Sequence, residues 1–346
     1  MKARPKSSEL LRSGTGWSHI LLLTILLVLS GCWPIAERVH ETPFPSQFAT
    51  GPVLPPPTDS ATRNPTSLPA TPTPSAGSLS RSLISNTPTT STEAAIAEDT
   101  ALAKVDERQG PVRITIVYDN NPYDPRLKTK WGFACLVQTG ETTLLFDTGG
   151  DGATLLNNMA TLGIEPESIE AIVLSHFHGD HTGGVNSLLA SGVRPMVYVP
   201  RSFPASFKSQ VQAITDLTGI EQGMQIADGV YTTGEMGSGI IEQALVVNTS
   251  KGLVVVTGCA HPGVAEMVCK AKEIGGDEVY LVLGGFHLGG ASEERIKAII
   301  RDFQQTGVQK VAPCHCTGDK AISLFREAYG EDFIQNGVGQ VMEIVP

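Results

Sequence analysis

The 346-residue sequence is poor in charged residues and in cysteine. Charged residues make up only 17%, and basic and acidic residues balance in residues 1–110, so residues 111–346 carry the whole net charge of −10. An acidic segment without a basic stripe is a poor match for nucleic-acid phosphates, and we therefore expect no nucleic-acid partner. Six cysteines are too few for a disulfide scaffold in a chain of this length.

The first 32 residues have the pattern of a lipoprotein-type signal peptide. A basic start is followed by the apolar run Ile20–Leu29, which is short against the roughly 20 residues that a spanning helix needs. The next residues, Ser30-Gly31-Cys32, complete a segment that resembles the bacterial lipobox, in which the cysteine is acylated and becomes the mature N-terminus. We expect Cys32 to be lipidated and the protein to be anchored to the lipid bilayer on the extracytoplasmic side of the cell membrane. The alternative is an uncleaved anchor with an incidental cysteine.

Residues 33–110 have the composition of a flexible tether. Twelve of the 23 prolines lie here, mixed with serine and threonine, and no apolar periodicity is present. Such a composition cannot bury enough apolar surface to offset the conformational entropy lost on folding. As a flexible coil the segment would span about 50 Å root-mean-square. We interpret it as a spacer, with a glycosylated mucin-like stalk as the alternative.

From residue 111 onward, short apolar runs alternate with amphipathic segments, which predicts mixed β-sheets covered by helices in one domain, 111–346. The expected strands are 112–118, 132–138, 142–147, 171–174, 196–199, 244–248, 252–257, 278–283, 308–312 and 341–344. The expected helices are 153–162, 183–190, 264–274, 292–305 and 321–329. Residues 201–239 depart from this rhythm, and we interpret them as a lid, a pocket wall or a small core of their own.

The clearest chemical signal directly follows the expected strand 171–174. Three histidines and an aspartate lie within six residues, and imidazole is a preferred ligand of zinc and related divalent ions. In an extended turn His176 and His178 project to the same side and can chelate one ion. Asp180 and His181, one turn further on, point to a neighbouring position suited to a second ion. The alternative is a solvated histidine-rich turn without metal.

The segment His176-Phe177-His178-Gly179-Asp180-His181 resembles the signature of the metallo-β-lactamase superfamily. Asp147 in F-D-T-G, His261 in T-G-C-A-H-P and His315 in P-C-H-C-T-G match the family's other motifs in the same order, across nearly all of residues 111–346. The resemblance implies an α/β fold, an αββα sandwich in which two mixed β-sheets pack face to face with helices outside. It also implies one or two divalent ions, with zinc expected and Mn²⁺, Fe²⁺ or Mg²⁺ as alternatives.

The resemblance assigns roles to these residues. A first ion would be held by His176, His178 and His261, and a second by Asp180, His181 and His315. A bound ion lowers the pKa of its water towards about 7 and polarises a substrate oxygen, so the metal-held hydroxide attacks. Asp180 would also orient the nucleophile or carry its proton. Asp147 would hold a ligand imidazole in its tautomer, or cap the Thr-Gly-Gly turn that follows it.

Smaller motifs resemble one branch of the superfamily. Asp119-Asn120-Asn121, Gly284-Gly285-Phe286-His287-Leu288 and the blocks around His261 and His315 are similar to the 7,8-dihydropterin-6-methyl-4-(β-D-ribofuranosyl)aminobenzene-5′-phosphate synthases. Many members of that branch are metal-dependent hydrolases. We expect a membrane-tethered hydrolase of a small ester, phosphoester or lactone-like substrate. The alternatives are a transferase of the synthase type and a non-catalytic metal-binding surface module.

One feature departs from the two-metal pattern of the superfamily. Many members bridge their ions with an aspartate at the end of a late strand, whereas here the strand 278–283 runs into Gly284, Gly285, Phe286 and His287. Either one metal suffices, or His287 takes part, or the bridge is only a hydroxide. We expect His287 either to contact substrate or support a ligand, or to bind metal itself.

Two further groups of residues have open roles. Asn120 and Asn121 lie at a strand end that this fold places near the metal, so they are candidate substrate contacts, although Asn-Asn-Pro is equally a turn former. We expect Cys259, Cys314 and Cys316 to be small buried apolar residues, with thiolate ligation of zinc as the alternative.

Overall fold

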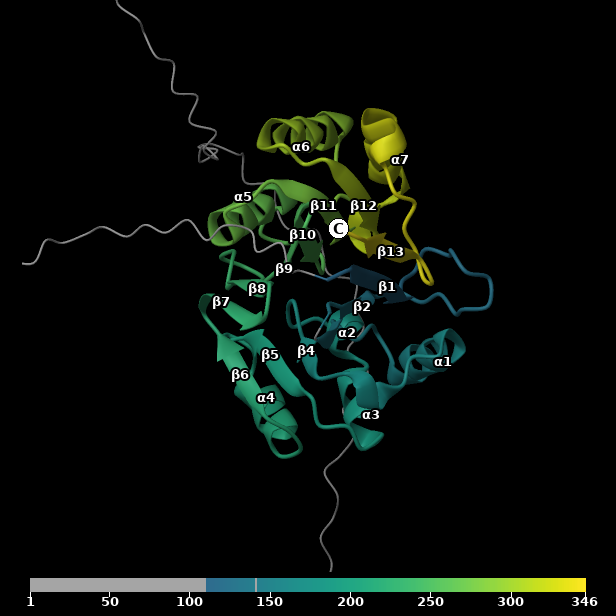
Figure 1. The fold of residues 1–346 in the computed structure, drawn as a ribbon, viewed down its shortest axis with the longest axis vertical. Coiled ribbons are helices and arrows are strands. Elements are labelled where there is room, and N and C mark those ends of the chain that lie inside the picture. Colours follow the sequence, from purple (N-terminus) through teal and green to yellow (C-terminus); the bar gives the residue numbers. More distant parts are fainter. Residues whose placement is uncertain (1–109, 141) are drawn as a thin grey trace, which may run out of the picture. The chain divides into compact units, whose positions relative to one another are not determined.

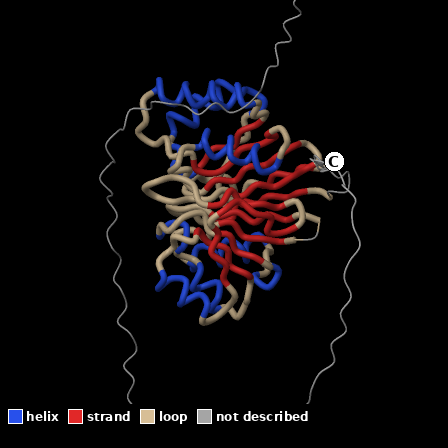
Figure 2. Tube along the Cα trace, turned by 90° about the vertical axis from the view of Figure 1, so that its left-hand side faces the viewer, coloured by secondary structure: helices blue, strands red, loops and turns tan. Residues whose placement is uncertain are grey.

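Two mixed β-sheets lie face to face, and helices cover the outer face of each. A computed structural model describes residues 110–346 apart from residue 141. Figure 2 shows the strands as a central double layer between helices. This confirms the expected α/β fold, an αββα sandwich. The expected signal peptide 1–32 with Cys32 and the tether 33–110 lie outside the described residues.

The first sheet has the strand order β13-β1-β2-β3-β4-β5-β6 (Figure 1). Its strands are β1 Val112–Tyr118, β2 Ala134–Gln138, β3 Thr143–Phe146, β4 Ala171–Val173, β5 Met196–Pro200, β6 Leu217–Ile220 and β13 Val341–Ile344. Neighbours from β3 to β6 are parallel, and the other pairs are antiparallel. Helices α1 Gly152–Leu162, α3 Val185–Ala190 and α4 Ala205–Gln212 pack on its outer face through buried residues such as Leu155, Leu188 and Val211.

The second sheet has the strand order β12-β11-β10-β9-β8-β7. Its strands are β7 Gln222–Ala227, β8 Val230–Gly234, β9 Leu245–Thr249, β10 Gly252–Thr257, β11 Val279–Gly285 and β12 Lys310–Cys314. Its outer face is covered by α5 Val264–Gly275, α6 Glu293–Thr306 and α7 Asp319–Tyr329. Short helices are α2 Gly179–Thr182, η1 Pro166–Ser168, η2 His315–Thr317 and η3 Gly330–Asp332. None of the helices in the described part is long and apolar enough to cross a membrane.

The sequence of α6 shows why these helices form and where they pack. Ser292 caps its start by accepting a hydrogen bond from the Arg295 N–H, which satisfies one of the free donors of the first turn. Ile296, Ile300 and Phe303 recur at helical spacing and are buried in the outer core of the second sheet. Between the two sheets, Ile114, Phe146 and Val254 belong to the central core.

Residues 201–239 are part of both sheets and do not form a separate lid. β6 completes the first sheet, and the chain then crosses directly into β7, which pairs with β8 at the edge of the second sheet. The aromatic residues of this stretch pack against the histidine motif: the ring of Phe177 lies 5.3 Å from that of Phe203 and 5.5 Å from that of Phe207.

Candidate metal centre

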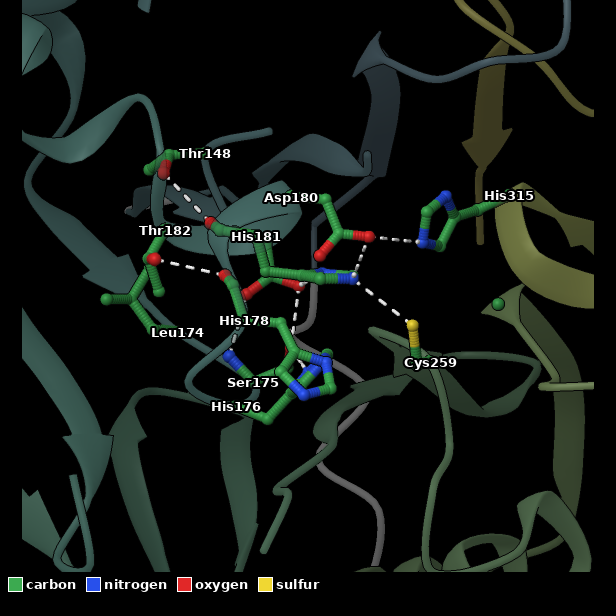
Figure 3. A network of polar contacts seen from close by, with 12 residues as sticks. Thr148, Leu174, Ser175, His176, His178, Asp180, His181, Thr182, Cys259 and His315 are labelled. Carbon is green, nitrogen blue, oxygen red and sulfur yellow. Dashed lines mark hydrogen bonds and ion pairs between the residues drawn. The ribbon is translucent and has the colours of Figure 1, made fainter. Parts of the chain in front are cut away.

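The loops after β3, β4, β10, β11 and β12 bring the histidines together. β3 pairs in parallel with β4, and β11 pairs in parallel with both β10 and β12. Carboxyl ends of parallel strands lie at the same edge of a sheet, which is where ligands bind in open α/β folds. The two sheets therefore contribute facing loops to one cluster of titratable side chains (Figure 3).

The histidine motif supplies the half of the cluster that comes from the first sheet. His176 is fully buried, and its Nε2 lies 3.0 Å from Nδ1 of His178. Two nitrogen ligands of one tetrahedral zinc ion are about 3.3 Å apart, so these two rings are placed as the sequence analysis predicted for a chelating pair. After them α2 turns the chain, and Thr148 fixes this turn by donating through its N–H and its hydroxyl to the carbonyl of His181.

Asp147 lies behind the motif and fixes the ring of His181. One oxygen of its buried carboxylate lies 2.7 Å from His181 Nδ1 and 2.7 Å from the Ser175 hydroxyl that donates to it, while the other accepts the Ser175 N–H. Burial disfavours the imidazolium form of His181, but the Asp147 carboxylate outweighs this and raises the His181 pKa to about 9. The Nδ1 proton of His181 is thus held towards Asp147, and Nε2 faces the centre of the cluster.

A buried glutamate organises the loop from the second sheet. The Glu242 carboxylate accepts the backbone N–H groups of Cys259 at 2.9 Å, Ala260 at 2.8 Å and His261 at 2.9 Å. Ala260 adopts a φ of 61°, a conformation that is costly for a residue with a side chain. Burial raises the pKa of Glu242 to about 7 although three N–H groups donate to it. No local pattern in the sequence indicates this role of Glu242, because its partners lie 17 to 19 residues further along the chain.

Asn120 lies in the centre and contacts His315, and its role as a substrate contact stays a prediction. Its amide nitrogen donates to the His315 carbonyl at 3.2 Å, and its amide oxygen lies 2.9 Å from His315 Nδ1. That oxygen can only accept, so Nδ1 carries the proton and Nε2 has a free lone pair. The ring of Trp131 packs against that of His315 at 4.9 Å. The side chain of Asn121 does not hydrogen-bond to the ring of His315 or to that of Trp131. Its amide nitrogen is buried and has no hydrogen-bond partner.

Two buried nitrogens in the centre lack a hydrogen bond. His315 Nε2 faces Asp180 Oδ2 at 3.4 Å without bonding it, and His261 Nε2 is equally unpartnered. Such atoms cost free energy unless something binds them. Burial alone would raise the pKa of Asp180, but the imidazoles of His315 and His181 hold it well below its usual range. The site thus offers imidazole nitrogens and an ionised carboxylate, the ligand types that a divalent cation prefers.

The candidate cation ligands form three overlapping groups, and the ligand atoms within each lie no more than 4.8 Å apart. The groups are Asp180, His181, Cys259 and His315; His176, Cys259 and His261; and Cys259, His287 and Cys316. The first contains all three residues expected for the second ion, and the second contains His176 and His261 of the three expected for the first ion, with Cys259 added to both. His178 is in none of the groups but contacts His176 at 3.0 Å.

The cysteines divide between the centre and the core. Cys259 and Cys316 lie in the cluster, as the alternative of thiolate ligation requires, and Cys259 is also buried, as expected. Cys314 is fully buried on the opposite side of its strand, beside Asp119. His287 completes the third group, and its ring lies 4.2 Å from that of His261.

Strained backbone conformations occur in the loops that form the candidate metal centre. Among the described residues, four that are not glycine have positive φ: Asp147, Ala260, His287 and His315. All four are in the loops that form the centre, and each such conformation costs on the order of 1–3 kcal/mol. The fold tolerates this strain where it positions the cluster.

Known proteins resemble this chain in sequence. The family model described as the metallo-beta-lactamase superfamily matches residues 132–258. The 7,8-dihydropterin-6-methyl-4-(beta-D-ribofuranosyl)-aminobenzene-5′-phosphate synthase of Methanocaldococcus jannaschii is 30% identical over 279 residues, which are 66% of this chain and 95% of the relative.

Solved structures resemble it in fold. A metal-dependent hydrolase of the β-lactamase superfamily has a TM-score of 0.57 and 26% identity, covering 68% of this chain and all of its own. The metallo-β-lactamase fold protein YhfI from Bacillus subtilis has a TM-score of 0.53 and 16% identity, covering 68% of this chain and 99% of its own.

Proposed function

The chain belongs to the metallo-β-lactamase superfamily, and from this premise we propose that it is a metal-dependent hydrolase of a small ester, phosphoester or lactone-like substrate. The observation that carries the proposal is a pair of buried ring nitrogens without a hydrogen bond, His261 Nε2 and His315 Nε2, in a cluster of further ligand atoms. In a cluster that only stabilises the fold, other protein atoms would hydrogen-bond to these nitrogens. A cation satisfies both.

The residues divide into two ligand sets. His176, His178 and His261 would hold one cation, and Asp180, His181 and His315 the second. When bound, such cations lower the pKa of a coordinated water towards about 7 and polarise a carbonyl or phosphoryl oxygen. Zinc is the cation that this mixture of imidazole, carboxylate and thiol donors fits best.

The remaining side chains keep the ligands in place. Asp147 holds the His181 ring through Nδ1, Asn120 holds the His315 ring in the same way, and Glu242 holds the backbone of the Cys259–His261 loop. Asp180 brings a negative charge to the second set and can accept a proton from the attacking water through its second oxygen.

Hydrolysis is tested with the zinc-loaded full chain on a panel of p-nitrophenyl esters, p-nitrophenyl phosphodiesters and lactones. We expect turnover of at least one class, lost in the double variant His176→Ala/His178→Ala and retained in Lys297→Ala, which removes an exposed side chain of α6. Equal rates for the wild type and the double variant would refute the proposal.

A synthase-type transferase is the second candidate, favoured by the 30% identical relative that the chain covers almost completely. It predicts release of diphosphate from a dihydropterin diphosphate, only in the presence of an aromatic amine acceptor. Diphosphate release with no hydrolysis across the panel would select the transferase.

We also propose that the protein is a lipoprotein held at the extracytoplasmic face of a membrane through Cys32 and the segment 33–110. The support is the basic start, short apolar run and lipobox-like end of residues 1–32. Labelled palmitate should be incorporated into the wild type and not into Cys32→Ser. Labelling of both proteins, or of neither, would contradict the anchor.

A further inference from the structure

Cys259 has a position that no other ligand shares. Its thiol belongs to every one of the three candidate cation groups, whereas no other residue of these groups belongs to more than one. The sulfur lies 3.2 Å from His181 Nε2, so it faces the first group, and the residue is only 4% exposed. Figure 3 shows the Cys259 sulfur joined to His181 by a dashed line.

The backbone around Cys259 is built to hold the sulfur there. Gly258 presses the end of β10 against the histidine motif: a Cβ on it would lie 2.1 Å from Ser175 Oγ and 3.0 Å from Asp147 Oδ2. Glu242 then accepts the N–H of Cys259 itself. Only glycine allows this close approach. The close contact at Gly258 and the hydrogen bond to Glu242 together fix the backbone that carries the thiol, which limits how far the thiol can turn away from the centre.

We propose that the Cys259 thiolate is a ligand shared by both cations, in place of the bridging carboxylate that many two-metal members of the superfamily use. This rests on the proposed metal-dependent function. Cation binding displaces the thiol proton to solvent, as for other cysteine ligands. A shared sulfur explains why the strand end at Gly284 and Gly285 needs no aspartate.

The shared thiolate also determines which cations the centre takes. Soft sulfur ligands favour Zn²⁺, Cd²⁺ and Co²⁺, while Mg²⁺ prefers an all-oxygen shell. We therefore expect Zn²⁺ to displace Mg²⁺ and Mn²⁺ from the wild-type centre. In Cys259→Asp, where an oxygen ligand replaces sulfur, this preference for Zn²⁺ over Mn²⁺ should fall at least tenfold.

Cadmium NMR tests the sharing directly, because the ¹¹³Cd chemical shift moves strongly downfield with each sulfur ligand. The full chain is loaded with ¹¹³Cd²⁺. We expect two resonances, both displaced downfield by sulfur, and both moving upfield in Cys259→Asp, which keeps a charged ligand at the same place. Cys314→Ser is the matched control, since that thiol is buried on the other side of its strand and belongs to none of the groups; it should leave both resonances unchanged.

Three results would overturn the proposal. One is movement of a single resonance in Cys259→Asp, which would make the sulfur a ligand of one cation only. Another is loss of the downfield shift in Cys316→Ser and not in Cys259→Asp, which would assign the sulfur to the group with His287. The third is two bound cadmium ions without any sulfur shift, which refutes the shared thiolate while leaving the metal-dependent function intact. A wild type that binds no cadmium, zinc or cobalt would instead refute the proposed function itself.

Discussion

Replacing Asp147 by asparagine tests how the fold prepares His181 to bind a cation. In the wild type the Asp147 carboxylate can only accept, so a proton of the His181 ring stays on Nδ1, and Nε2 faces Cys259 and Asp180. In Asp147→Asn one oxygen can still accept the Ser175 N–H, but the new NH₂ group points at His181 Nδ1. The ring then moves its proton to Nε2, the atom that faces Cys259 and Asp180.

The size of the effect follows from this change of tautomer. A cation must displace the Nε2 proton before His181 can bind it, and loss of such a supporting partner typically costs 10–100-fold in affinity. This corresponds to about 1.4–2.7 kcal/mol. The loss should fall on the cation held by Asp180, His181 and His315, and the cation held by His176 and His261 should keep its affinity.

The assay is competition for Zn²⁺ against a chromophoric chelator, with the two binding steps fitted separately. Asp151→Asn is the matched control: Asp151 caps α1 and pairs with Lys130, away from the histidines. We expect the control to keep its stability within about 1 kcal/mol, because asparagine caps a helix as well as aspartate does and an exposed ion pair contributes little, and to lose no zinc affinity. Unchanged zinc binding in Asp147→Asn, or an equal loss in both variants, would refute the argument.

Three further substitutions give distinct outcomes. Asn120→Ala removes the acceptor of His315 Nδ1 and should weaken the same zinc step about tenfold; an equal loss at both steps in the competition assay would contradict this. Asn158→Ala removes a buried amide that hydrogen-bonds with the Lys128 N–H, the Lys128 carbonyl and the Val117 carbonyl. Urea unfolding should show that the free energy of unfolding falls by about 2–4 kcal/mol. A surface substitution should change it by less than about 0.5 kcal/mol. Gly285→Ala places a Cβ 2.4 Å from the Gly258 carbonyl oxygen, so its melting temperature should fall, while Gly239→Ala, with open space around it, should melt like the wild type.

Most of the fold is predictable because its core elements carry strong local patterns. The strand expected at 112–118 is found at the same residues, and the helix expected at 292–305 runs from Glu293 to Thr306. The strands of residues 201–239 are the exception. β7 exposes most of its residues, Met224 among them at 43%, so its sequence has no apolar alternation and its position depends on pairing with β8.

In the candidate centre, too, local motifs are predictable from the sequence, and contacts between distant residues are not. The ligand motif from His176 to His181 is local, so its spacing is visible in the sequence. The contacts that orient the ligands join distant residues: Asn120 and His315 are 195 positions apart, and no periodicity connects them. Cys259 lies two positions before His261, and this proximity to an expected ligand was the available signal for its place in the centre.

The central claim is that this cluster is a two-cation site, and metal content tests it most directly. Elemental analysis should be made on the full chain after zinc loading and removal of free metal, beside the variant His176→Ala/His178→Ala. We predict close to two zinc ions per wild-type chain and loss of at least one in the variant. Zinc at the level of the variant in the wild-type protein, or none in either, would contradict the claim.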